Sequence, residues 1–317
     1  MDTCVPATNT APSPRIQKRQ DGKVLNREER LFMFLSSDVN RVYCDLLLSV
    51  IPEFEKTNVL LQSGAPQIHL LREILHNLLR DLMLRFVKPS VIKGTDVLTD
   101  IDYKSFDNQR DDEDVVLGSQ TARSLQNLKK EARQEVFALI RRYFVTASDY
   151  IILKFPLKSV ILKSAEVARL STIEQARFAD VKYFIDRFPV LLPVAEEQSM
   201  ESALDEVQAQ FSRLQVEDLP AQITMQKRID EQWCAVSDLQ DMDGTFKYAK
   251  LSKVMLGILT VPHNNAECER VFSKVRKAHT QFRSFMSKKI LEQLLVARCS
   301  QSGKCHEQVF DKDFLRK

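Results

Sequence analysis

The sequence predicts an all-α protein, and two observations support this fold class. The chain contains only seven glycines in 317 residues, and it is rich in leucine, glutamate, lysine and arginine. Such a composition favours helices over structures built on tight turns and bulged strands. Apolar residues also recur at intervals of three and four along much of the chain, whereas strands would show alternation.

Polar stretches bound the predicted helices. Residues 1–27 contain three prolines among polar side chains, so we expect a disordered tail, which is either a solvated segment or a basic nuclear-entry signal. Helices are expected at 28–50 and 68–86, each followed by a proline that ends it. Residues 301–317 form a second polar, basic tail.

Residues 93–118 stand out because acidic side chains cluster there. They include Asp96, Asp100, Asp102, Asp107, Asp111, Asp112, Glu113 and Asp114. Metal-dependent nucleotidyl transfer needs carboxylates held rigidly around two cations. These acids do not follow apolar strands, so their positions should not be fixed. We interpret the segment as a solvated acidic loop, with incidental cation binding as the alternative.

The middle of the chain returns to helical patterns. Amphipathic helices are predicted within 122–187, at 199–216 and at 246–259. An aromatic stripe that includes Phe178 and Phe184 suits a packed core better than a platform for stacking bases. Trp233, the single tryptophan, is expected to anchor the core.

Residues 261–300 concentrate the most unusual pattern in the chain. Asn264 can cap a helix that begins at about Asn265. Its apolar stripe comprises Cys268, Val271, Phe272 and Val275, and its basic residues lie outside that stripe. A second helix should begin at about Ser287 and carry an aliphatic seam of Ile290, Leu291, Leu294 and Leu295. Both apolar surfaces need a partner.

This segment resembles the C-terminal dimerisation region of the hAT transposase family. The family signature places Ser-Glu-Arg, one variable residue and Phe-Ser before basic residues and a Leu-rich helix, and residues 268–273 read CERVFS, with Cys268 in place of the usual serine. A weaker similarity extends back to FVKPSVI at 86–92. The resemblance implies a helical insertion-type domain at 28–245, with its acidic loop, followed at 246–300 by the helical remnant of a ribonuclease-H-like core.

The same resemblance bears on catalysis. The family's enzymes bind divalent metal with two aspartates and one glutamate, and the glutamate of the signature corresponds to Glu269. The two aspartates would come from strands ahead of the insertion, and the sequence shows no such half. One carboxylate cannot hold two cations, so we expect no enzymatic activity, with Glu269 vestigial, and no metal, cofactor or small-molecule substrate. His69 with His76, and Cys299 with Cys305 and His306, fit metal sites poorly.

Two functions follow from these residues. The first is dimerisation, with a second copy or another hAT-type protein, through Val271, Phe272, Val275, Ile290, Leu291, Leu294 and Leu295; packing within the chain is the alternative use of these side chains. The second is DNA binding without cleavage through Lys274, Arg276, Lys277, Lys288 and Lys289. The net charge is only +3, so any DNA contact would be local. We expect no membrane association and a nuclear location.

Overall fold

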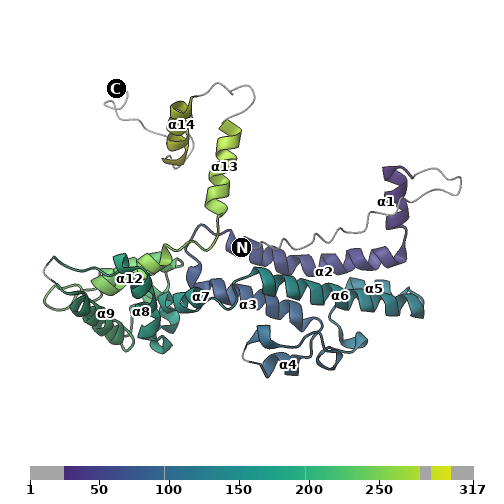
Figure 1. Ribbon diagram of the computed structural model, residues 1–317, viewed down its shortest axis with the longest axis horizontal. Coiled ribbons are helices and arrows are strands. Elements are labelled where there is room, and N and C mark those ends of the chain that lie inside the picture. The colour runs from purple at the N-terminus through teal and green to yellow at the C-terminus, as the bar shows by residue number, and fades with distance from the viewer. Residues whose placement is uncertain (1–24, 96, 197, 279–286, 301–317) are drawn as a thin grey trace, which may run out of the picture. The chain divides into compact units, whose positions relative to one another are not determined.

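The computed structural model describes residues 25–95, 97–196, 198–278 and 287–300 (Figure 1). The α-helices are α1 (Arg27–Leu35), α2 (Asp38–Leu61), α3 (Ile68–Leu84), α4 (Pro89–Lys93), α5 (Ser119–Gln126), α6 (Lys130–Lys154), α7 (Val160–Ala165), α8 (Phe178–Arg187), α9 (Met200–Leu214), α10 (Ala221–Thr224), α11 (Ile229–Ser237), α12 (Ala249–Leu259), α13 (Ala266–Ala278) and α14 (Lys288–Ser300). Short 3-10 helices are η1 (Leu98–Asp100), η2 (Phe106–Asn108), η3 (Asp112–Asp114), η4 (Glu166–Ala168), η5 (Leu170–Gln175) and η6 (Pro189–Leu191). Within these ranges extended pairing is limited to isolated bridges, so the predicted all-α class is confirmed. Every described helix is too short or too polar to span a lipid bilayer.

The chain divides into two compact units. Unit 1 contains residues 1–59 and 72–159, and unit 2 contains residues 60–71 and 160–317. Helices α2 and α3 both run across this division. The predicted domain limits at residues 27, 245 and 300 stay predictions.

The long helices α2, α3 and α6 run side by side in Figure 1, and their buried apolar side chains form the core of unit 1. The buried side chains recur at helical spacing, and they include Val42, Leu46, Val50, Leu75, Leu79, Leu82, Val136, Ile140 and Phe144. The rings of Phe86 and Phe144 stack with centroids 5.6 Å apart and an interplanar angle of 7°. This geometry is the offset stacking that aromatic pairs favour.

Pro52 lies inside α2, so the prediction that it ends the helix is wrong. A proline in a helix interior removes one backbone hydrogen bond and strains the preceding turn. Here Arg85 supports that turn from outside α2, because its Nη2 donates to the Ser49 carbonyl at 2.7 Å and pairs with Glu53 at 3.5 Å. Burial of Val50 and Thr57 on either side of the proline adds tertiary packing that outweighs the local penalty.

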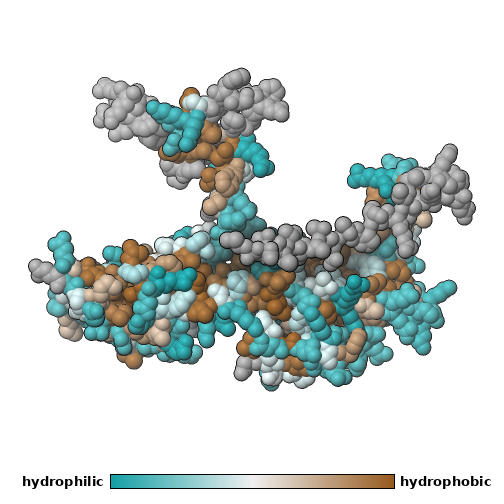
Figure 2. Space-filling view, in the orientation of Figure 1, coloured by the Kyte–Doolittle hydropathy of each residue, from teal (hydrophilic) through white to brown (hydrophobic). Residues whose placement is uncertain are grey.

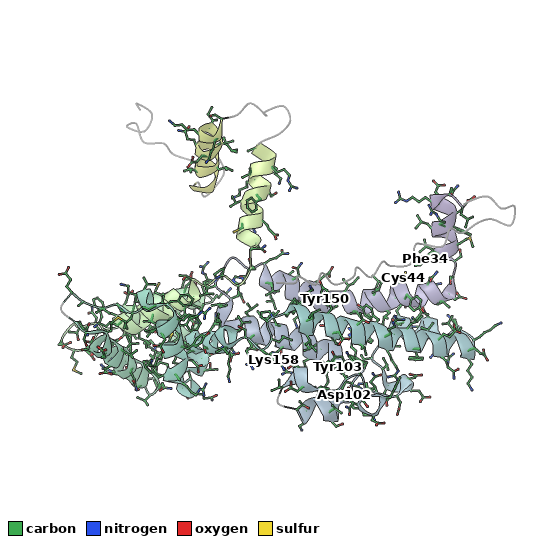
Figure 3. The ribbon with its side chains drawn as sticks, in the orientation of Figure 1. Phe34, Cys44, Asp102, Tyr103, Tyr150 and Lys158 are labelled. Atoms are coloured by element: carbon green, nitrogen blue, oxygen red, sulfur yellow. The ribbon has the colours of Figure 1, made fainter. Side chains whose placement is uncertain are left out.

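The described part of the acidic loop, 97–118, is ordered, so the prediction that its acids are not fixed in position is also wrong there; Asp96 lies outside the described residues. Between the acids lie apolar side chains that are buried, among them Leu98, Ile101 and Tyr103. Tyr103, labelled in Figure 3, donates its hydroxyl hydrogen to Asp149 of α6. The loop therefore contributes to the core of unit 1 through the residues that separate its acids.

Arg141 of α6 holds the same loop at three points. Its guanidinium donates to the carbonyl of Arg110 at 2.7 Å, to Gln109 Oε1 at 3.0 Å and to Asp112 Oδ1 at 2.7 Å. A salt bridge of 3.0 Å joins Lys158 to Asp100. These partners lie far along the chain, which is why the loop's own composition did not predict its order.

Unit 2 packs around the tryptophan. Trp233 of α11 has no exposed surface, and its Nε1 donates to the Ala168 carbonyl at 2.7 Å. The predicted role of Trp233 as a core anchor is confirmed. Helix α12 contacts α8, α9 and α11. It also contacts η6, where Gly257 allows a close approach, because a Cβ atom at that position would lie 2.4 Å from Leu191 Cδ2.

Candidate dimerisation surface

The surface begins from a firmly packed helix, α12. Leu251, Val254, Met255 and Ile258 have no exposed surface. After α12 the Thr260 hydroxyl donates to the Gly257 carbonyl at 2.7 Å, and the chain passes through Pro262 to the start of α13. The segment that follows is thus attached to the core of unit 2.

Helix α13 begins at Ala266, one residue after the predicted start, and Asn264 caps it as predicted. Its Oδ1 accepts a hydrogen bond from the Ala266 N–H at 2.7 Å. The Asn265 carbonyl accepts the first regular helical bond, from the Glu269 N–H at 3.0 Å. A side-chain acceptor at this place satisfies an N–H group that has no partner inside the helix.

The apolar stripe of α13 faces solvent. Phe272 is 66% exposed and Val271 is 40% exposed. Cys268 is exposed as well, and Val275 is half-buried. A phenyl ring left in water forgoes much of the free energy that its burial would supply, about 1.5–3 kcal/mol for a side chain of this size.

Helix α14 carries the second part of the surface. The Ser287 hydroxyl accepts from the Ile290 N–H at 3.3 Å, which confirms the predicted cap. Ile290 is 55% exposed, while Leu291, Leu294 and Leu295 are half-buried. Helices α13 and α14 contact each other, and hydrophobic residues are visible on both in Figure 2. The structure thus brings the seven predicted interface residues together on two contacting helices; their use in a dimer stays a prediction.

The predicted DNA-contacting residues lie on the same two helices. Lys274, Arg276 and Lys277 of α13 are exposed, as are Lys288 and Lys289 of α14. Phosphate contacts are made by exposed lysine and arginine side chains, so all five are accessible for that role.

The base of α13 makes contacts that the sequence did not predict. Asn264 Nδ2 donates to the Leu61 carbonyl, and Arg270 Nη2 donates to the Gln62 carbonyl at 2.7 Å. Their partners lie about two hundred residues earlier in the chain. Neither periodicity nor a short motif reports on a pairing over that separation.

Two histidines lie in the same part of unit 2. His69 is 6% exposed, and no hydrogen-bond partner reaches its Nδ1. Burial lowers the pKa of His69 to about 4, and the positive charges of Arg169 and His263 contribute to this shift. Burial also lowers the pKa of His263, although hydrogen bonds with the backbone of Ser63 and Leu61 oppose the effect. Both side chains are therefore neutral at pH 7.

Glu269, the residue that matches the family's catalytic glutamate, has an exposed side chain on α13. The described residues contain no group of three or more histidine, cysteine, aspartate or glutamate side chains able to hold a metal ion. Glu269, His69 and His76 are among these described residues. The Cys299 side chain, Cys305 and His306 lie outside the described residues.

Comparison with known families gives one match. Residues 244–299 match the family model of the hAT family C-terminal dimerisation region. The hAT resemblance is confirmed for this segment. No curated protein and no solved structure matches the chain.

The matched residues, called the hAT-type region below, contain α12, α13 and all of α14 except Ser300. They begin at Gly244, whose φ of +84° suits glycine. The match supports a hAT transposase-derived origin for a chain of which it covers the smaller part. It also joins the packed helix α12 and the exposed helices α13 and α14 in one family-defined segment.

Proposed function

We propose that this protein dimerises through its hAT-type region, with α13 and α14 of one copy packing on those of a second copy. The observation that carries the proposal is the exposed stripe of Val271 and Phe272 within a segment that matches a dimerisation region. Another hAT-type protein with the same stripe could replace the second copy. The proposed interface comprises Val271, Phe272, Val275, Ile290, Leu291, Leu294 and Leu295.

The size of the surface sets the expected affinity. Seven large apolar side chains per copy would each contribute at most about 1.5–3 kcal/mol on full burial, and several of them are already half-buried. Association costs about 4–15 kcal/mol in lost freedom of motion. We therefore expect a dissociation constant in the micromolar range rather than the picomolar range.

A pair of phenylalanine substitutions tests this function. Phe272→Ser removes an exposed ring from the proposed interface, and Phe106→Ser removes a ring that is 79% exposed in unit 1. We expect light scattering on the eluting full-length chain to show that Phe272→Ser shifts the population to monomer while Phe106→Ser does not. Equal behaviour of the two variants would argue against the interface, and so would a dimer that survives Leu294→Asp.

DNA binding is the second candidate function, because the five predicted DNA-contacting side chains of α13 and α14 are exposed. Binding of this kind would be electrostatic and would weaken steeply as salt rises from about 50 to 200 mM. Lys274→Glu combined with Lys277→Glu should weaken duplex binding and leave dimerisation intact. Affinity that is independent of salt would contradict a phosphate contact.

We further propose that the protein does not cut or join DNA, with Glu269 vestigial. A single carboxylate does not hold two cations, and the described residues offer Glu269 no cluster of metal ligands. Oligonucleotide cleavage in magnesium or manganese that disappears in Glu269→Gln would contradict this proposal.

The origin and location of the chain are also proposals. Residues 28–245 would be a helical insertion-type domain, and 246–300 the helical remnant of a ribonuclease-H-like core. A nuclear location is tested by imaging the tagged full-length chain. The comparison is a variant in which serine replaces the basic residues of the possible nuclear-entry signal, Arg15, Lys18, Arg19 and Lys23. A cytoplasmic wild-type protein would contradict it.

A further inference from the structure

The end of helix α2 is bound by the beginning of α13. Helix α2 ends at Leu61, and the last carbonyl groups of a helix have no partner within it. Asn264 Nδ2 donates to the Leu61 carbonyl, and Arg270 Nη2 donates to the Gln62 carbonyl at 2.7 Å. Both contacts lie within unit 2. Residues 61 and 62 thus receive side-chain donors from Asn264 and Arg270 of the hAT-type region.

Asn264 has two roles in this arrangement. Its Oδ1 caps α13 through the Ala266 N–H at 2.7 Å, while its Nδ2 reaches Leu61. Arg270 lies one helical turn beyond Ala266, about 6 Å along the axis. A helix held at both its cap and its second turn is fixed in direction as well as in position.

The Arg270 contact also fixes how α13 is rotated about its own axis. Successive residues of an α-helix are about 100° apart around that axis. On this geometry Cys268, Val271, Phe272 and Val275 lie roughly 100–200° from Arg270. The apolar stripe is therefore on the opposite side of the helix from the contact with Gln62. This agrees with the exposure of Phe272, which is 66%.

We infer that Asn264 and Arg270 are positioning residues for dimerisation. By holding the end of α2 they set the direction and rotation of α13, so that its apolar stripe is turned outward toward the second copy. Neither side chain needs to touch the partner. The inference rests on the proposed dimerisation and adds to it a requirement for residues outside the interface.

Substitutions can separate this positioning role from the capping role. Asn264→Asp keeps a side-chain oxygen that caps a helix as well as asparagine does, but it replaces the donor to Leu61 with a second acceptor. Arg270→Met removes the donor to Gln62 and keeps a long aliphatic chain. Arg276→Met is the matched control, because it removes one exposed positive charge from the same helix. Arg270→Lys retains a donor and tests for rescue.

The full-length variants are compared by sedimentation equilibrium and thermal unfolding. Asn264→Asp and Arg270→Met should each raise the dimer Kd by about 3- to 10-fold, because a net hydrogen bond contributes about 0.5–1.5 kcal/mol. The double variant should raise it by roughly 10- to 100-fold. Arg276→Met should leave Kd within about twofold of wild type, since surface changes away from contacts have small effects. Arg270→Lys should recover part of the lost affinity, and Tm should fall by no more than about 5 °C in any variant, because each substitution removes few contacts and a weaker dimer stabilises the fold less.

A distance measurement reports the orientation of α13 directly. Nitroxide labels are attached at Lys253→Cys on α12 and Lys277→Cys on α13, with the native cysteines replaced by serine. Both positions are exposed. Pulsed electron paramagnetic resonance on samples diluted with unlabelled protein should give one narrow distance distribution in the parent chain and a broad one in the Asn264→Asp, Arg270→Met double variant.

The two measurements distinguish failure of this inference from failure of the proposed function. A wild-type chain that stays monomeric contradicts dimerisation, and the distance distributions then decide the positioning role alone. If wild type dimerises, the inference is overturned by a double variant with wild-type Kd, by an unchanged distance distribution, or by an Arg270→Lys variant as weak as Arg270→Met.

Discussion

Trp233 and His69 are both buried in unit 2, but their polar groups have different surroundings. Trp233 Nε1 satisfies the Ala168 carbonyl, and both groups are enclosed by apolar side chains. His69 is enclosed as well, but it lies beside Arg169 and His263 rather than beside an acid. The first residue is therefore sensitive to substitution, and the second to pH.

Trp233→Phe should lower the free energy of unfolding by about 2–4 kcal/mol. The substitution leaves a cavity and removes the donor from a buried carbonyl. Phe246→Leu is the control, because Phe246 is 54% exposed and its change should cost less than about 0.5 kcal/mol. Chemical denaturation measures both. Equal stabilities of the two variants would contradict the assignment of Trp233 as the anchor.

Stability should fall as the pH drops from about 6.5 toward 4. In that range the unfolded chain protonates residue 69, whereas in the folded protein burial lowers the pKa of His69 to about 4. The unfolded state then binds more protons, so acid favours it. The loss attributable to His69 is at most about 3 kcal/mol, because one pKa unit corresponds to about 1.4 kcal/mol. Denaturation at a series of pH values should show a shallower dependence for His69→Gln, and parallel curves would contradict the prediction.

At the scale of elements, the acidic loop is held in place by a side chain from another element, Arg141 of α6. Arg141 of α6 reaches the Arg110 carbonyl, Gln109 and Asp112, while the loop's apolar residues enter the core. A bidentate guanidinium is not replaced by an ammonium group, which cannot reach several acceptors in one plane.

Arg141→Lys should release this loop and lower the free energy of unfolding by about 1–3 kcal/mol. Arg142→Lys, one residue later and exposed, should have almost no effect. Hydrogen exchange of peptides spanning 97–117 measures the release together with the stability. Slow exchange in both variants would show that the buried apolar residues alone keep the loop ordered.

The difference between local patterns and contacts from distant parts of the chain explains how much the sequence could predict. Helices whose apolar residues repeat locally, such as α9 and α12, were predicted closely, as were the caps at Asn264 and Ser287. The passage of α2 through Pro52 was not, because it depends on Arg85 from another helix. In the candidate site, the interface stripe follows from spacing, whereas the contacts of Asn264 and Arg270 with residues 61 and 62 join distant parts of the chain.

At the scale of the whole molecule, the packed core and the exposed stripe have different purposes. Helix α12 shares its buried face with α8, α9 and α11, and it attaches the hAT-type region to unit 2. Helices α13 and α14 leave large apolar side chains in water, although burying them would be favourable. A second copy of the chain supplies that burial in our account.

The most direct measurement is the mass of the wild-type chain by sedimentation equilibrium, over a range of roughly 1–100 µM around the expected dissociation constant. The account predicts a mass that rises with concentration from 36.6 kDa toward twice that value. A mass that stays at 36.6 kDa over the whole range would contradict dimerisation.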